Sequence, residues 1–295
     1  AGVGSQIAFV AYNDFITGQS AGLAFKRCTV DYVVMSANTS IGFYGHGGIG
    51  LTKVLFEDCT VKNAGYAAFG QINTENTIIS RCVAVNCTAF AKAERSGANF
   101  YIYRCRSIAG ANSACGALID GSIQSNAYIR HSESQIVGTP GIRVVVDNVT
   151  VDARYCTFTP LSGVGKVISA MRNGAVRIEN CIGWAPNSVY VRNNSFSFTG
   201  GSNLYYSNSL PTGAAGWSVG IEGAAMWTFA QWKAGSGQDQ NSVIGLPVIT
   251  TPVSEASFTV FDPTCPVFTS GFTCGVQATD DSETLALLAG VGYTP

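Results

Sequence analysis

Charged residues are scarce in this chain of 295 residues. Only 12% of them are Asp, Glu, Lys or Arg, and the formal net charge is −1. Nucleic-acid-binding proteins normally carry a basic stripe that neutralises phosphates, so this composition argues against a nucleic-acid partner. Long apolar runs are also missing, since none approaches the roughly 18 residues of a membrane-spanning helix. The first 20 residues lack the basic start and apolar core of a signal peptide. We therefore expect neither a membrane span nor a leader.

Metal-ligand patterns and long helical patterns are missing too. The chain has two histidines and no Cys-x-x-Cys pair, so no metal site is predicted. No segment before residue 210 shows a helical run of a dozen residues, which excludes ankyrin, tetratricopeptide and HEAT repeats.

A four-residue pattern recurs along most of the chain. Each copy carries an apolar residue, two polar or bulky residues, and then Cys or Ser, as in Ile178-Glu179-Asn180-Cys181. The fourth residues are Cys28, Cys59, Cys82, Cys105, Ser132, Cys156, Cys181 and Ser207. Their spacing of 23 to 31 residues is typical of a solenoid or another repeat array.

The repeats contain short strands. Alternating apolar residues such as Val176 and Ile178, or Thr52, Val54 and Phe56, have the period of a strand. Stacked coils place equivalent residues about 4.8 Å apart. The Cys/Ser column then marks a bend, with the six column cysteines as buried free thiols. Residues 20–210 resemble the right-handed parallel β-helix superfamily, which includes pectate-lyase-like enzymes, alginate-modifying enzymes and phage tailspikes. We therefore predict an all-β, right-handed parallel β-helix solenoid with a short C-terminal capping region.

The boundaries follow from where the pattern stops. Residues 1–215 are predicted to form the coils, and residues 216–295 the last coils and cap of the same domain. We expect a strand over residues 7–10 in an uncovered first coil, which indicates a fragment or a chain packed against something upstream. A protruding glycine-rich loop is expected over residues 42–50, helices over 224–233 and 281–289, and two or three strands over 244–275. Cys265 and Cys274 are the disulfide candidates.

Counting back from each column residue places several charged residues at similar offsets. Glu94 lies 11 residues before Cys105, and Asp120 lies 12 before Ser132. In a chain so poor in charge, such a concentration suggests one polar flank along the solenoid axis, suited to an extended glycan. The members are His46, Lys92, Glu94, Arg95, Asp120, Arg143, Asp147 and Arg172. Each member alone is an ordinary surface or turn residue, so the set is the better indication.

Three chemical interpretations of this flank stay open. Glu94 and Asp120 on adjacent coils would stand about 5 Å apart, as in a retaining glycosidase. Asp147 opposite Glu94 across two coils would give the wider spacing of an inverting enzyme. In a lyase, Lys92 or Arg143 would abstract a proton, while Arg95 or Arg172 neutralises a uronate carboxylate. His46 joins Lys92 and the three arginines as a substrate-binding residue.

The resemblance implies recognition and cleavage of an extracellular polysaccharide, by a hydrolase or lyase on a phage spike or a secreted enzyme. Spikes of this kind are usually homotrimers. No cofactor is expected, except Ca²⁺ if the chain is a lyase, since several superfamily lyases need it. The alternative is a non-catalytic carbohydrate-binding or structural adhesin module. Aromatic residues between Phe43 and Tyr101 offer sugar-stacking surfaces, although most Phe residues are expected in the core.

Overall fold

The computed structural model describes most of the chain. The described residues are 6–12, 21–32, 40–46, 51–72, 74–93, 98–110, 119–121, 125–137, 142–144, 149–162, 166–170, 174–185, 188–191, 197–207, 217–218, 226–269, 271 and 273–295. Within them, no helix is long and apolar enough to cross a membrane.

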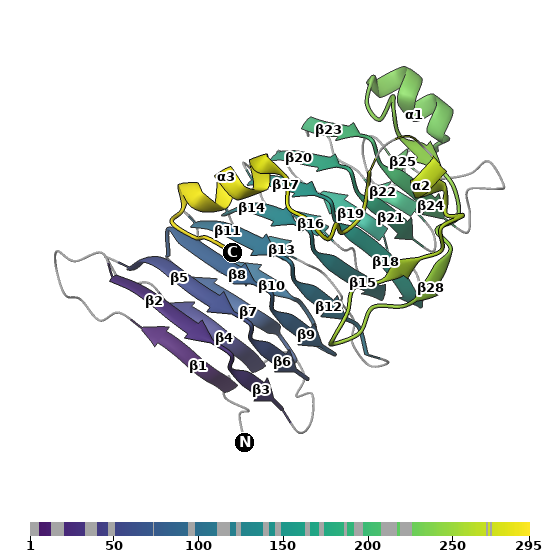
Figure 1. The fold of residues 1–295 in the computed structure, drawn as a ribbon. Helices are drawn as coiled ribbons and strands as arrows, with labels where there is room; N and C mark the ends of the chain where they lie inside the picture. Colours follow the sequence, from purple (N-terminus) through teal and green to yellow (C-terminus); the bar gives the residue numbers. More distant parts are fainter. Residues whose placement is uncertain are drawn as a thin grey trace.

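Three parallel sheets wind around one core, so the predicted parallel β-helix is confirmed (Figure 1). The ten-stranded sheet contains β1 (Gln6–Tyr12), β4 (Ser40–His46), β7 (Ala67–Ile72), β10 (Ala91–Ala93), β13 (Ile119–Gly121), β16 (Ile142–Val144), β19 (Lys166–Ala170), β22 (Ser188–Val191), β25 (Trp217–Ser218) and β26 (Met226–Trp227). The eight-stranded sheet contains β2 (Ala21–Lys26), β5 (Leu51–Glu57), β8 (Asn76–Ser80), β11 (Ala98–Tyr103), β14 (Ser125–Arg130), β17 (Val149–Arg154), β20 (Gly174–Glu179) and β23 (Ser197–Gly201). The nine-stranded sheet contains β3 (Thr29–Asp31), β6 (Thr60–Lys62), β9 (Val83–Val85), β12 (Arg106–Ile108), β15 (Glu133–Val137), β18 (Thr157–Ser162), β21 (Ile182–Ala185), β24 (Leu204–Ser207) and β27 (Val243–Ile244).

Each coil visits the three sheets in turn, because one strand of each follows the last along the chain. Side chains alternate between the core and the outside, as in β17, where Val149 and Val151 are buried and Thr150 is half-buried. Phenylalanines stack inside the first coils: the rings of Phe43 and Phe69 lie 5.7 Å apart, and both side chains are fully buried. The core therefore runs along the solenoid axis.

The Cys/Ser column lies at the bend between the eight- and nine-stranded sheets, where it completes the hydrogen bonding of the backbone. The amide of Cys59 donates to Sγ of Cys82 at 3.4 Å, and the amide of Cys105 donates to Oγ of Ser132 at 3.0 Å. A buried amide needs an acceptor, and only a small residue fits at the bend. This explains the repeated choice of Cys or Ser and confirms the stacked column.

The last predicted column member is wrong. Asn203 occupies that place instead of Ser207, because its Oδ1 accepts the amide of Cys181 at 2.8 Å. Ser242 continues the column by accepting the amide of Asn203 at 2.9 Å. Ser207 instead ends strand β24, one sheet further on.

The residue before each column member adopts the left-handed backbone conformation, with φ from 49° to 55°. We call these residues the corner ladder. They are Arg27, Asp58, Arg81, Arg104, His131, Tyr155, Asn180 and Ser202. Non-glycine residues seldom adopt this conformation, which bends the chain sharply and leaves successive corner side chains one above the other. Arg81 pairs with Asp58 of the previous coil at 2.8 Å in this way.

Two glycines explain differences from the sequence predictions. Residues 42–46 belong to strand β4, so the predicted loop is wrong there, and residues 47–50 lie outside the described part. A Cβ atom on Gly42 would meet the methyl groups of Val61 at 2.5 Å, so this glycine permits close packing. Helix α1 (Phe229–Ser236) begins and ends later than predicted. Gly235 lies inside it, against the Trp227 ring, and Gly237 ends it.

A buried cluster under helix α1 covers the last coils. Thr228 and Gln231 form a capping box at the start of the helix. Trp232 packs below and donates its indole hydrogen to Asp239 at 3.0 Å. Asp239 is fully buried, and it also accepts hydrogen bonds from Asn203 at 2.9 Å and from Ser242 at 2.6 Å. The predicted C-terminal cap is therefore built around one carboxylate.

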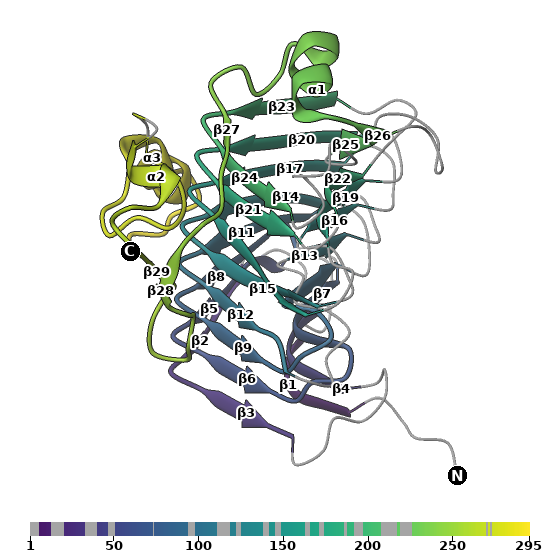
Figure 2. The ribbon, with the colours of Figure 1, turned by 90° about the vertical axis from the view of Figure 1, so that its right-hand side faces the viewer.

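Beyond the cap, the chain turns back and runs along the outside of the coils. We call residues 246–295 the tail. It contains β28 (Ile249–Thr251), β29 (Val260–Phe261), α2 (Pro266–Thr269) and α3 (Ser282–Gly290), the last close to the predicted final helix and capped by Asp281. Cys265 and Cys274 are free buried thiols, so the suggested disulfide is absent. Figure 2 shows the tail on the side of the molecule away from the ten-stranded sheet.

The tail docks on the corner ladder and on the strand ends beside it. Arg104 pairs with Asp280 at 2.9 Å, Arg154 pairs with Glu283, and Asn180 donates to the carbonyl oxygen of Thr273 at 2.8 Å. Leu288 packs into a buried apolar cluster with Ile78, Tyr101, Tyr103 and Tyr293. The tail therefore ties together coils that are far apart in sequence.

Replacing Tyr293 with phenylalanine should loosen the end of the tail. Its hydroxyl contacts Ser80 at 2.6 Å, Glu57 at 2.9 Å and Arg81 at 3.1 Å. Losing a buried hydroxyl with these partners costs about 1–3 kcal/mol. Limited proteolysis and thermal unfolding should show earlier cleavage of the tail and a lower Tm. The control is Tyr128→Phe, since this ring stacks on Tyr101 and its hydroxyl bonds no described residue. Equal behaviour of the two variants would contradict this account.

Candidate functional site

Three members of the predicted polar flank occupy one register column of the ten-stranded sheet. Lys92 on β10 pairs with Asp120 on β13, and Asp120 pairs with Arg143 on β16. Adjacent strands lie about 4.8 Å apart, so the column places a carboxylate position between two cationic ones. We call these three residues the charged column.

The remaining predicted members are placed differently or lie outside the described part. His46 ends β4 and pairs with Ile72, two residues beyond Gly70, which pairs with Lys92. His46 therefore belongs to the same sheet but not to the charged column. Glu94, Arg95, Asp147 and Arg172 lie outside the described residues. The Glu94–Asp120 and Glu94–Asp147 pairs thus stay predictions, and the observed neighbour of Asp120 is Lys92.

One aromatic ring accompanies the charged column. The ammonium group of Lys92 lies 3.8 Å from the centroid of the Tyr66 ring. Most other aromatic candidates serve the core, because Phe43, Phe69, Phe90 and Phe100 are fully buried. Tyr66 is half-buried, so it is the candidate best placed for contact with a ligand.

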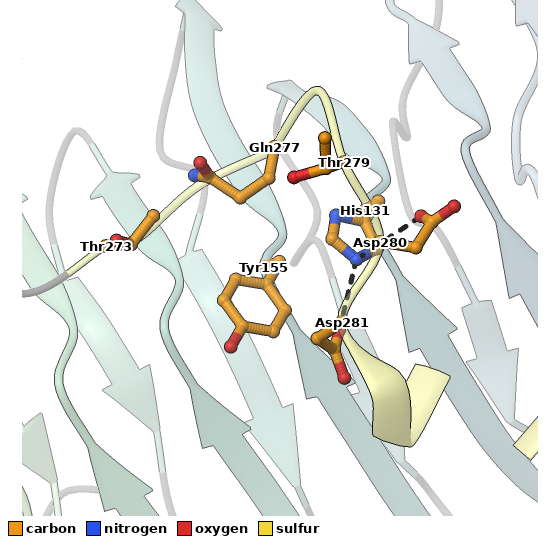
Figure 3. A pocket seen from close by; sticks show the side chains of 7 residues that line it. All are labelled: His131, Tyr155, Thr273, Gln277, Thr279, Asp280 and Asp281. Atoms are coloured by element: carbon orange, nitrogen blue, oxygen red, sulfur yellow. Dashed lines mark hydrogen bonds and ion pairs between the residues drawn. The ribbon is translucent and has the colours of Figure 1, made fainter. Parts of the chain in front are cut away.

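A second site lies where the tail meets the corner ladder (Figure 3). We call it the tail pocket, a cavity of about 310 Å³. The ladder supplies His131 and Tyr155, and the tail supplies Thr273, Gln277, Thr279, Asp280 and Asp281. The rings of His131 and Tyr155 stack in parallel, with their centroids 5.0 Å apart and 6° between their planes. Apart from Tyr155, the lining is polar or charged, so the pocket suits a polar ligand.

His131 lies between two carboxylates. Its Nε2 atom lies 3.3 Å from Asp281 Oδ2 and 3.6 Å from Asp280 Oδ1. Burial lowers the pKa of His131 below its usual 6.5, although both carboxylates act against this. The ring is therefore neutral at neutral pH. Burial also opposes ionisation of Asp281, but hydrogen bonds from Thr284 and His131 outweigh it and lower the pKa of this carboxyl.

The tail pocket was not predicted from the sequence. His131 was recognised only as the residue before a bend, and Asp280 and Asp281 only as the start of a helix. The missed signal is chemical, because an imidazole at a corner position is exceptional in a chain with two histidines. No grouping of three or more His, Cys, Asp or Glu side chains suited to a metal ion occurs among the described residues.

Comparison with known proteins adds no further constraint. No protein-family model, curated protein or solved structure matches this chain.

Proposed function

We propose that this solenoid recognises an extended extracellular polysaccharide along its ten-stranded sheet. The observation that carries the proposal is the register of Lys92, Asp120 and Arg143 on three consecutive strands. A linear glycan repeats its groups along one direction, and stacked coils repeat theirs along the solenoid axis. The tail lies on another side of the molecule, so it leaves this sheet accessible.

The balance of charge favours an acidic glycan. Lys92 and Arg143 supply two cations for each Asp120, and Lys92 lies over an aromatic ring that a sugar can also contact. Uronate carboxylates would pair with the two cations, while Asp120 accepts hydrogen bonds from sugar hydroxyls.

Lys92→Gln and Arg143→Gln should each weaken binding of an acidic glycan about fivefold, because an exposed ion pair contributes up to about 1 kcal/mol. Affinity electrophoresis in gels containing alginate, pectate or a neutral glucan measures this. Added salt should weaken binding further. Arg177→Gln on the eight-stranded sheet is the matched control, and it should bind as the unmodified protein does. Equal weakening by Arg177→Gln would place the glycan elsewhere.

Cleavage of the bound glycan is the finer form of this proposal. In a hydrolase, Asp120 and Glu94 act as the carboxylate pair, with Asp147 as the partner of Glu94 in an inverting enzyme. In a lyase, Lys92 or Arg143 removes the proton and Arg95 or Arg172 neutralises the uronate. His46 lies on the same sheet and extends the substrate-binding surface.

Reducing-end release from a polysaccharide panel tests cleavage. Glu94→Gln and Asp120→Asn should each lower the rate at least about 100-fold if they carry acid–base chemistry. Ultraviolet absorbance of an unsaturated product distinguishes elimination from hydrolysis. Binding without release by the unmodified protein would instead show the alternative function, a non-catalytic carbohydrate-binding or adhesin module.

The expected location and assembly also belong to this proposal. A polysaccharide-binding spike or secreted enzyme acts outside the cell, and the resemblance to tailspikes implies a homotrimer. Light scattering after size-exclusion chromatography measures the assembly directly, and a monomer at working concentration would contradict it. A Ca²⁺ requirement is expected only for the lyase form.

A further inference from the structure

The tail pocket has the size and enclosure of a small-molecule site. Its volume of about 310 Å³ is at the lower end of the range for ligand pockets, roughly 300–1,000 Å³. Its two walls come from the corner ladder and from the tail, which are joined by several hydrogen bonds and ion pairs. The pocket therefore has a fixed shape in the assembled molecule.

The polar groups that face the pocket lack hydrogen-bond donors. Gln277 uses its amide hydrogens on the carbonyl oxygens of Cys274 and Gly275, at 2.9 and 3.0 Å, which leaves its Oε1 atom as an acceptor. His131 donates from Nε2 to Asp281, since a carboxylate only accepts. Its Nδ1 atom then carries a lone pair, and it has no partner among the described residues. Figure 3 shows this nitrogen on the side of the ring turned away from the two carboxylates.

The His131 side chain is only 1% exposed, so an unsatisfied acceptor on it is costly. The hydroxyls of Tyr155, Thr273 and Thr279 form no hydrogen bond with any described residue. A ligand that fits this lining must bring several donors of its own.

The charge of the lining selects the ligand further. Arg104 neutralises Asp280, but Asp281 faces no cation among the described residues, because His131 is neutral. Burial raises the pKa of Tyr155, and the negative charges of Asp281, Glu283 and Glu179 raise it further, with Arg154 acting against them. The pocket therefore carries a net negative field. This field disfavours anions and favours a cation.

We infer that the tail pocket binds a small organic cation that carries a primary ammonium group on a polar body, of the amino-sugar class. The ammonium group provides three donors and one positive charge for Asp281 and the free acceptors. The ring hydroxyls match Thr273, Thr279 and Tyr155. This inference rests on the pocket alone and does not depend on the glycan proposed for the ten-stranded sheet.

The test is an NMR titration of the histidine ring resonances with glucosamine at neutral pH. Glucose and N-acetylglucosamine serve as probes of the same ring without the charge. Glucosamine should shift the His131 signals saturably and should bind at least about tenfold more tightly than either neutral sugar, a difference of about 1.4 kcal/mol.

Two lysine variants provide the matched control. Thr279→Lys places a tethered ammonium group at an exposed position of the pocket, and it should abolish glucosamine binding. Val260→Lys adds the same charge to a 51% exposed position of the tail outside the pocket, and binding should persist. Absence of a saturable shift with glucosamine would overturn the inference. Equal binding of glucose would overturn it as well, as would equal loss of binding in both variants.

Discussion

Replacing Asp239 with alanine is expected to lower the free energy of unfolding by about 3–5 kcal/mol. The carboxylate is fully buried and accepts hydrogen bonds from Trp232, Asn203 and Ser242, with the Tyr205 hydroxyl at 3.2 Å. Alanine leaves these donors buried without an acceptor. Each unsatisfied donor costs about 1–3 kcal/mol, and partial rearrangement reduces the sum.

Urea unfolding followed by tryptophan fluorescence measures the effect of Asp239→Ala, because Trp232 reports on the cap itself. The neighbouring exposed residue provides the control, and Gln240→Ala should change stability by no more than about 0.5 kcal/mol. A small loss for Asp239→Ala, similar to that of Gln240→Ala, would mean that the cluster under α1 does not hold the last coils.

Glu133→Gln is expected to stabilise the protein above neutral pH. Burial raises the pKa of Glu133 from 4.5 to about 7, although hydrogen bonds from Thr259 and the charge of Arg106 act against it. The folded state therefore binds a proton that the unfolded state releases between these two values. The contribution of this group to stability falls as the pH rises from about 4.5 to about 7. The full difference is about 3 kcal/mol.

Glutamine keeps the acceptor for the Thr259 amide, and it removes the charge. The variant and the unmodified protein should therefore be closest in stability below about pH 4.5. The variant should gain progressively up to about pH 7, as measured by Tm against pH. Glu75→Gln, at an exposed position, is the matched control and should stay within about 0.5 kcal/mol. An advantage of Glu133→Gln that is largest in acid would contradict the assigned sign.

The stacking of coils is predictable because one chemical requirement recurs in every coil. A bend with a buried amide of the previous coil demands a small residue that also accepts a hydrogen bond, and Cys82 and Ser132 both meet it. The pattern fails at the last coil because Asn203 meets the same demand and was not among the residue types expected. The motif at Ser207 resembles the others only in its letters.

The candidate site was predictable only in part. The charged column appears because Lys92 and Arg143 lie at the same distance from their bends, and the strand register agrees. His46 also lies at this distance, yet it falls two positions away from Tyr44, which shares the register position of Gly70. Loops between strands differ in length from coil to coil, so counting residues gives the right sheet but not always the right position.

The tail pocket could not be predicted, because it depends on where a distant segment docks. The sequence indicates a helix that begins near Asp281, and it indicates a bend at His131. Nothing in either pattern specifies that the two meet, 150 residues apart. Such contacts depend on side-chain complementarity across the surface, which has no periodic signature.

The return of the tail has a consequence for assembly. The hydroxyl of Tyr293 contacts Ser80 and Glu57, which end neighbouring strands of the eight-stranded sheet, and the second partner lies 236 residues earlier in the chain. One atom can reach both only when these coils have wound without slippage, since a shift of one residue turns a strand's side chains to the opposite face. The last residues to leave the ribosome thus inspect the winding of coils made near the start of synthesis. A misaligned solenoid would remain unlatched and open to proteases.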